Sequence, residues 1–97
     1  MPVLRPAGWC VYLIRCGDGS LYCGVTNRLE HRLAAHRAGS GARYTRGRGP
    51  LRLCWTEPAA DRGTALRRER AVKRLSREEK RALLRSARGN TFSPARP

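Results

Sequence analysis

Two short segments of strand-forming residues, joined by a glycine-rich turn, constrain the fold of this chain more than any other feature. The segments are Trp9–Cys16 and Leu21–Thr26, and Gly17–Gly19 lies between them. Valine, isoleucine, tyrosine and tryptophan favour strands, and a glycine cluster between two such runs is typical of a hairpin turn. The sequence therefore predicts an antiparallel hairpin whose first strand is well buried.

The length of the turn decides which side chains share a face of this hairpin. A two-residue turn at Asp18-Gly19 would place Tyr12 and Tyr22 on opposite faces of the sheet. A three-residue loop with a glycine bulge places both tyrosines on one face, with Tyr12 opposite Gly24. We expect the three-residue loop, because Gly24 then leaves room for the tyrosine ring and a ligand.

A helix, a loop and a third strand are expected after the hairpin. Asn27 and Glu30 form a capping-box pattern, and Gly39 is suited to follow the end of that helix. Segment 39–50 combines glycine and arginine without apolar periodicity, which predicts a mobile cationic surface loop. The alternation in Leu51–Thr56 predicts a strand with three side chains on one face. These are Leu51, Leu53 and Trp55.

Two further helices complete the expected fold. Asp61 or Thr64 can cap the second helix, and Ser76 with Glu79 forms a capping box for a third helix over Arg77–Ala87. The predicted fold is of the α/β (α+β) class. It consists of a small, three-stranded, mainly antiparallel sheet flanked by about three helices.

The 97 residues are expected to form one domain over 9–87, with a lead at 1–8 and a disordered tail at 88–97. The lead lacks the apolar core of a signal peptide, and no segment is apolar enough to span a bilayer. The four cysteines lack the close spacing of a zinc site, so we expect reduced thiols, mostly in the core. These features predict a cytoplasmic protein.

The excess of positive charge indicates an anionic partner. Lysine and arginine number 21 against 7 acidic residues, which gives a formal net charge of +14. Self-repulsion at this charge destabilises a compact chain unless something negative is bound. Arginine, which supplies all the cations except Lys73 and Lys80, suits bidentate phosphate contacts, although GC-rich coding would also raise its share. Nucleic acid is the leading partner class, ahead of an anionic membrane surface.

The first expected helix carries cationic side chains along one face. Arg28, Arg32 and His36 follow one another at intervals of four, so their side chains form one ridge. Beside a hairpin, such a ridge would make a platform for phosphate. Judged on helix geometry alone, a solvated helix face is the simpler alternative.

Glu69 is an isolated acid on the inward side of the second expected helix, within one turn of Leu66 and Val72. A carboxylate that faces inward needs a partner such as a metal or a guanidinium group. The alternative is an intrahelical pair with Lys73, worth about 0.3–0.5 kcal/mol. A pair that weak does not explain the inward placement, so a functional role is favoured.

The order of these residues along the chain resembles that of the GIY-YIG nucleases. Segment 10–12 stands for the GIY triplet and segment 22–24 for YIG, within a resemblance that covers 9 to about 84. Segments 41–45 and 65–69 are similar to small stand-alone bacterial members. Aromatic strand residues alone would more often be core packing. The set becomes specific with the residues that follow at the right spacing, which are Arg32, His36 and Glu69.

Three positions depart from the family pattern. Cys10 stands where the first triplet has glycine, which changes packing only. Val25 stands where some repair nucleases carry a lysine. Many members have an asparagine after the glutamate helix, and the candidate here, Asn90, lies in the expected tail and is assigned no role.

The resemblance implies hydrolysis of a phosphodiester by water, with one divalent ion, Mg²⁺ or Mn²⁺, bound by Glu69. Tyr12 would be the general base, which requires neighbouring cations to lower its pKa. Arg32 would brace the phosphate as charge builds. Tyr22 would orient the water or the phosphate, and His36 would hydrogen-bond the phosphate or shuttle a proton.

The expected function is therefore a metal-dependent, structure-selective DNA endonuclease of repair or recombination, with RNA as a second substrate option. The alternatives are a non-catalytic DNA- or RNA-binding protein and a small basic protein associated with RNA or the ribosome. Further nucleic-acid contacts are expected along the first helix, the 39–50 loop and the second helix. These residues are Arg28, Arg43, Tyr44, Arg46, Arg48 and Lys73.

Overall fold

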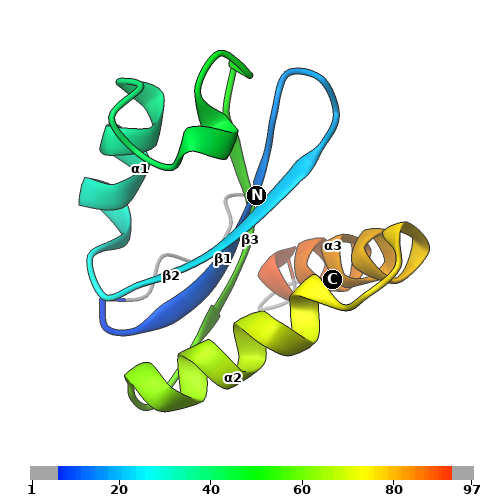
Figure 1. Ribbon diagram of the computed structural model, residues 1–97. Coiled ribbons are helices and arrows are strands. Elements are labelled where there is room, and N and C mark those ends of the chain that lie inside the picture. Colours follow the sequence, from blue (N-terminus) through cyan, green and yellow to red (C-terminus); the bar gives the residue numbers. More distant parts are fainter. Residues whose placement is uncertain (1–6, 93–97) are drawn as a thin grey trace.

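A three-stranded antiparallel sheet forms the centre of the computed structural model, which describes residues 7–92 (Figure 1). Its strands are β1 (Cys10–Arg15), β2 (Leu21–Thr26) and β3 (Arg52–Pro58). Because β1 pairs antiparallel with both of the others, the order is β2-β1-β3, and β2 lies at one edge. The predicted sheet is confirmed.

Helices cover both faces of this sheet. Helix α1 (Leu29–Arg37) and the short 3₁₀ helix η1 (Arg43–Thr45) lie on one side, and helices α2 (Arg62–Lys73) and α3 (Arg77–Phe92) lie on the other (Figure 1). The predicted mixed fold with three long helices is confirmed. The segment 39–50, predicted as a mobile cationic surface loop, contains the turn of 3₁₀ helix and a buried threonine.

Helix α3 is longer than the sequence predicts. The expected end is Ala87, but the helix continues to Phe92 through the first part of the expected tail. A single glycine inside a helix costs only about 1 kcal/mol, which is not enough to end it at Gly89. Residues 93–97 of the expected tail lie outside the described residues, as do residues 1–6 of the expected lead.

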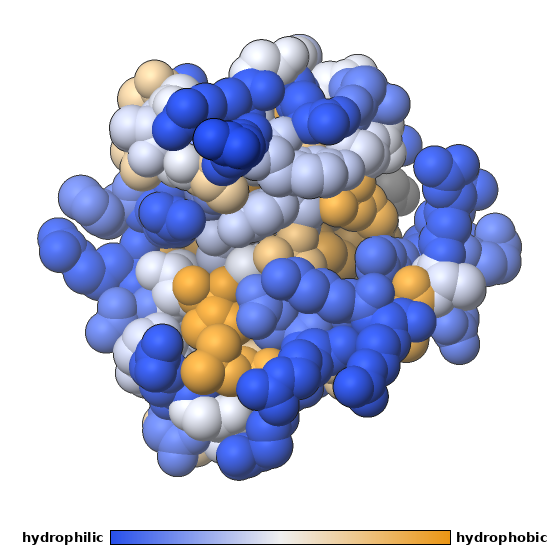
Figure 2. All heavy atoms as spheres, in the orientation of Figure 1, coloured by the Kyte–Doolittle hydropathy of each residue, from blue (hydrophilic) through white to orange (hydrophobic). Residues whose placement is uncertain are grey.

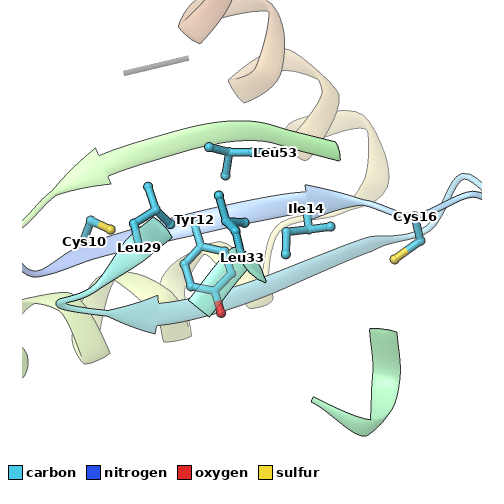
Figure 3. Packing of buried hydrophobic residues seen from close by; sticks show 7 residues of the cluster. All are labelled: Cys10, Tyr12, Ile14, Cys16, Leu29, Leu33 and Leu53. Carbon is cyan, nitrogen blue, oxygen red and sulfur yellow. The ribbon is translucent and has the colours of Figure 1, made fainter. Parts of the chain in front are cut away.

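Each face of β1 supports its own hydrophobic cluster, as its unbroken apolar run predicts. The cluster on the α1 side is drawn in Figure 3 and contains Cys10, Tyr12, Ile14, Cys16, Leu29, Leu33 and Leu53. The cluster on the side of α2 and α3 contains Val11, Leu13, Cys23, Trp55, Ala65 and Val72. Tyr12 therefore belongs to the core, although its hydroxyl points past β2 (Figure 3).

The hairpin has the predicted three-residue loop. The Cys16 N–H donates to the Ser20 carbonyl oxygen at 2.9 Å, and Gly19 has a φ of 85°, a left-handed conformation that favours glycine. Tyr12 pairs with Gly24, which confirms the expected register. Tyr22 pairs with the next inward residue of β1 and packs on the same cluster as Tyr12, so both tyrosines share one face.

The prediction for β3 was wrong in one respect, since Leu53 and Trp55 face opposite sides of the sheet. Leu13 pairs with Trp55, but the next residue, Ile14, pairs with Leu53. This shift is a β-bulge in which Cys54 is the extra residue, and each bulge reverses the alternation of faces.

The predicted cap of α1 was also wrong. The N-cap is Arg28, not Asn27, and its side chain makes no capping hydrogen bond. The Thr26 hydroxyl, at the end of β2, accepts from the Arg28 N–H at 3.0 Å instead. A residue of the preceding strand thus takes the place of the capping side chain.

The other helix starts are as predicted. The Thr64 N–H donates to Asp61 Oδ1 at 2.8 Å at the start of α2. Before α3, Ser76 and Glu79 bond each other's N–H groups at 2.8 Å and 3.1 Å, which is a complete capping box. All four cysteines are free, and three are buried. Within residues 7–92, no helix is long and apolar enough to cross a membrane.

Candidate active site

Four of the five predicted catalytic side chains line one open cavity of about 360 Å³ beside the edge strand β2. We call this cavity the candidate cleft. Tyr12 comes from β1, Tyr22 from β2, Arg32 from α1 and Glu69 from α2. In Figure 2, a paler band crosses the molecule between the hydrophilic side chains above and those over α2 below. The rest of the lining consists of Trp9, Gly24, Val25, Thr26, Asn27, Arg62 and Leu66.

His36, the fifth predicted residue, lies behind the cleft and is 1% exposed. Its Nε2 is 2.9 Å from the Tyr12 hydroxyl, and its Nδ1 is 3.0 Å from Thr45 Oγ1. Its ring also packs at an edge against Tyr22, with 5.2 Å between the centroids. The expected ridge of three cations is therefore not formed at the surface, because its last member is buried and bonded to Tyr12.

We assign the tautomer of His36 from the hydrogen bonds of Thr45. The Thr45 hydroxyl donates to the Ala42 carbonyl oxygen at 2.9 Å, so its oxygen is left to accept from His36 Nδ1–H. The Ala42 N–H also points at the same Nδ1, at 3.4 Å, and would donate to it in the other tautomer; the assignment follows the shorter contact with Thr45. With the hydrogen on Nδ1, Nε2 is an acceptor, and the Tyr12 hydroxyl donates to it.

The pKa of Tyr12 is shifted upward, whereas a phenolate base requires a lowered pKa. Burial raises the pKa of Tyr12 to about 12, and this outweighs the lowering by a hydrogen bond and the positive charge of Arg32. The expected lowering by cations is therefore wrong in its net direction. Burial, followed by the charge of Arg32, lowers the pKa of His36 below its ordinary 6.5, so the imidazole is neutral at pH 7.

Arg32 connects the two tyrosines electrostatically. A hydrogen bond with Tyr12 is the main cause that raises the pKa of Arg32, and Tyr22 contributes in the same direction. The guanidinium group stays charged at all pH values of interest. It therefore places a fixed positive charge beside the two hydroxyl groups, where an anionic group entering the candidate cleft would meet it.

Glu69 faces the cleft, as its inward position predicts, and its side chain is 18% exposed. It also forms the alternative pair, because Lys73 Nζ lies 3.4 Å from Glu69 Oε2. No cluster of three or more histidine, cysteine or acidic side chains occurs within the described residues. A single carboxylate fits Mg²⁺ or Mn²⁺, which retain several waters and bind through one or two carboxylates and substrate phosphates.

Two glycines allow the close approach of Tyr12 and His36 to the chain. A Cβ at position 24 would overlap the hydroxyl of Tyr12. A Cβ at position 41 would lie 2.5 Å from His36 Nδ1 and 2.8 Å from its Cα. Real Cβ atoms do not tolerate such distances, so both Gly24 and Gly41 belong to the construction of the site.

The six expected nucleic-acid contacts have different surroundings. Arg28, Arg43 and Arg46 are exposed, and Tyr44 is 41% exposed. Arg48 is engaged within the protein, because its guanidinium group lies 4.4 Å from the centre of the Tyr44 ring and 2.5 Å from Asp18 Oδ2. The remaining residue is Lys73, the partner of Glu69.

Sequence reasoning missed Thr45, the acceptor that orients His36, and Arg62, a second cation of the candidate cleft. No pattern marks Thr45, since it lies in a segment without periodicity. Thr45 does lie in segment 41–45, which is similar to a segment of other small family members, and this similarity could have indicated a role. Arg62 could have been found as the first residue of α2, since Glu69 lies two turns further along the same helix.

Comparisons with known proteins identify the family of this chain. The model of the GIY-YIG catalytic domain matches residues 8–82, and the chain therefore belongs to the GIY-YIG family, which is a family of endonucleases. A UPF0213 protein of Nitratidesulfovibrio vulgaris is 51% identical over 84 residues, which cover 87% of this chain and 76% of that protein. A UPF0213 protein of Vibrio cholerae is 46% identical over 80 residues, covering 81% and 79%.

One solved structure also resembles this fold. The solution structure of a UPF0213 protein of Bacillus halodurans matches with a TM-score of 0.52 and 45% sequence identity, covering 78% of this chain and 81% of that one. The chain is thus similar to small proteins in which the GIY-YIG domain fills most of the length.

Proposed function

We propose that this protein is a metal-dependent endonuclease that hydrolyses phosphodiester bonds in structured or duplex DNA, in repair or recombination in the cytoplasm. The observation that carries the proposal is the convergence of Tyr12, Tyr22, Arg32 and Glu69 on one cleft from four different elements. A solvated helix face or simple core packing does not require these side chains to meet. The net charge of +14 supports an anionic polymer as the substrate.

In the proposed mechanism, Tyr12 and His36 together accept the proton of the attacking water. With a pKa of about 12, Tyr12 is protonated at pH 7, and the phenolate is only about one part in 10⁵. Tyr12 therefore takes the proton of water as its own proton moves to His36 Nε2, 2.9 Å away. The new bond joins the water oxygen to phosphorus, the bond to the leaving oxygen breaks, and that oxygen takes a proton from solvent.

The other side chains stabilise the charge that develops on phosphate. Arg32 is placed to bind the phosphate oxygens as they gain charge, and Tyr22 to orient the water or the phosphate. Glu69 would hold the divalent ion, which supplies Lewis-acid stabilisation of the phosphoryl oxygens when bound. The Lys73 side chain, 56% exposed, would move away from Glu69 toward solvent or a substrate phosphate.

The proposal is tested by cleavage of a panel of branched, single-stranded and duplex DNAs with and without Mg²⁺ or Mn²⁺. Tyr12→Phe keeps the ring and should lose about 10²–10⁴ in single-turnover rate. Arg32→Ala should lose rate and also weaken phosphate binding. In the double variant the losses should not add, because both groups act on one transition state. If the wild type binds DNA but never cleaves it with either metal, the protein is a non-catalytic nucleic-acid-binding protein.

A further inference from the structure

A second cavity, of about 400 Å³, lies between the hairpin turn, Tyr44 and helix α3. We call it the α3 groove. It shares no lining residue with the candidate cleft. Its wall includes five cationic side chains, which are Arg15, Arg77, Lys80, Arg81 and Arg85.

Four of these cations form a continuous stripe along one face of α3. Arg77, Lys80, Arg81 and Arg85 follow one another at intervals of three, one and four residues, so they lie on neighbouring turns of the same side. Leu84, in the same stripe, is half-buried against the sheet and fixes this side of the helix toward the groove. The stripe therefore results from the packing of α3.

The positive charge of the α3 groove is almost uncompensated within the protein. Among the described residues, Arg81 is the only cation of the α3 stripe with an acidic partner. This partner is Glu78, whose Oε1 lies 3.9 Å away on the exposed surface. A pair of this kind contributes about 0–1 kcal/mol at most. Arg15, from β1, faces the same cavity from the sheet. Like charges that converge from two elements create a strong positive potential, which a polyanion would neutralise.

The α3 groove continues the candidate cleft along β2. Leu21 lines the groove and Tyr22, the next residue, lines the cleft. The Tyr22 ring lies 5.8 Å from that of Tyr44, which forms part of the groove wall. From Leu21 to Gly24 the strand rises about 10 Å, at about 3.3 Å per residue. Consecutive phosphates of one DNA strand advance about 3.4 Å along the duplex axis, so a single backbone can reach both cavities within a few nucleotides.

We propose that the α3 groove binds the phosphodiester backbone of the strand that the candidate cleft holds, within a few nucleotides of the scissile phosphate. This inference rests on the proposed function for the identity of the second phosphate, but the binding itself needs no catalysis. Arg48 links two parts of the groove wall, because it bonds Asp18 of the hairpin turn and stacks on the ring of Tyr44. The groove is therefore formed before the nucleic acid arrives.

The first test compares two double variants that remove the same charge. Arg81→Gln with Arg85→Gln changes the groove, and Arg70→Gln with Arg74→Gln changes exposed residues at the same spacing that line neither cavity. Glutamine keeps a high helix propensity, and circular dichroism checks that each variant is folded. Affinity for duplex DNA is measured in EDTA at several salt concentrations, so the result does not depend on cleavage.

Loss of two phosphate contacts should reduce the magnitude of the slope of log K against log salt by about 1.8. If the groove variant and the wild type bind equally at 1 M salt, the variant should bind about 60-fold more weakly at 0.1 M salt. The control double variant should lose less than half of this slope change. Equal losses in both variants, or no loss in the groove variant, would overturn the proposal.

The second test locates the phosphate that the groove binds. Single phosphates of a DNA ligand are replaced by neutral methylphosphonates, and the affinities of the wild type and the groove variant are measured for each position. Replacing a phosphate that the groove binds should lower the DNA affinity of the wild type but leave the affinity of the groove variant unchanged. Such a result shows that the phosphate and the groove residues are coupled, because independent effects would add. Additive effects at every position would overturn the inference. Absence of cleavage in the wild type would instead overturn the proposed function and leave this result standing.

Discussion

Replacing Thr45 by valine should disable the proposed proton acceptor without touching the candidate cleft. Valine resembles threonine in shape but has no hydroxyl, so His36 Nδ1–H loses the acceptor that lies 3.0 Å away. Thr45 is 2% exposed and does not line the cleft, so no direct contact with substrate is removed. The change therefore reaches the chemistry through the imidazole; it also removes the Thr45 hydrogen bond to the Ala42 carbonyl oxygen.

The magnitude follows from the cost of a buried donor without an acceptor, about 1–3 kcal/mol. His36 can avoid this cost by moving its hydrogen to Nε2, because the Ala42 N–H, 3.4 Å from Nδ1, can then donate to the bare nitrogen. In that tautomer Nε2 donates to Tyr12 and cannot accept its proton. A tautomer equilibrium shifted by about 1–3 kcal/mol lowers the reactive population, and hence the single-turnover rate, by about 5- to 150-fold.

The assay is single-turnover cleavage, with DNA affinity measured in parallel, and Thr45→Ser as the control. Serine keeps the hydroxyl and should retain most of the rate, whereas valine should lose it at unchanged affinity. Nitrogen NMR of the His36 ring reports the tautomer directly. Equal rates in the two variants, with the hydrogen on Nδ1 in both, would refute the reasoning that Thr45 orients the acceptor.

Further predictions concern the same site. Glu69→Gln should abolish cleavage and leave DNA binding intact or slightly tighter, as measured by nicking and titration, because it removes the metal ligand and a negative charge. Gly24→Ala should destabilise the fold by about 1–3 kcal/mol in urea unfolding, because a Cβ there overlaps the Tyr12 hydroxyl, whereas Gly8→Ala, with no atom within 4 Å, should not. Because the pKa of Tyr12 is raised from its usual 10 to about 12, the fold should lose about 3 kcal/mol of stability as the pH rises from 10 toward 12; a phenylalanine variant should lack this slope. Because the pKa of His36 is lowered, the midpoint of the fall in rate on the acid side should lie below pH 6.5; a midpoint above 6.5 would contradict its role.

The sequence was sufficient for the features that local patterns determine. The hairpin register followed from the glycines of the turn, and it correctly placed Tyr12 opposite Gly24. The inward position of Glu69 followed from helix periodicity, and the residue does line the candidate cleft. A turn between neighbouring strands and the periodicity of one helix were enough for these predictions, because both depend on residues that are close in sequence.

Features that depend on contacts between distant segments could not be predicted in this way. The bulge at Cys54, which turns Leu53 and Trp55 to opposite faces, depends on how β3 pairs with β1. The net rise in the pKa of Tyr12 depends on burial, which a count of nearby cations does not reveal. The α3 groove was missed because Arg15 and the cations of α3 are far apart in the chain and meet only across the folded sheet.

The burial of Tyr12 links the stability of this small protein to its proposed chemistry. The ring packs in the cluster that includes Leu29 and Leu33, and the same packing raises the pKa of its hydroxyl. Substitutions that loosen this cluster would admit water, bring the pKa nearer to 10 and change the proton transfer, even at a distance from the substrate. A substitution of Leu29 or Leu33 should therefore change both the stability of the fold and the proposed chemistry.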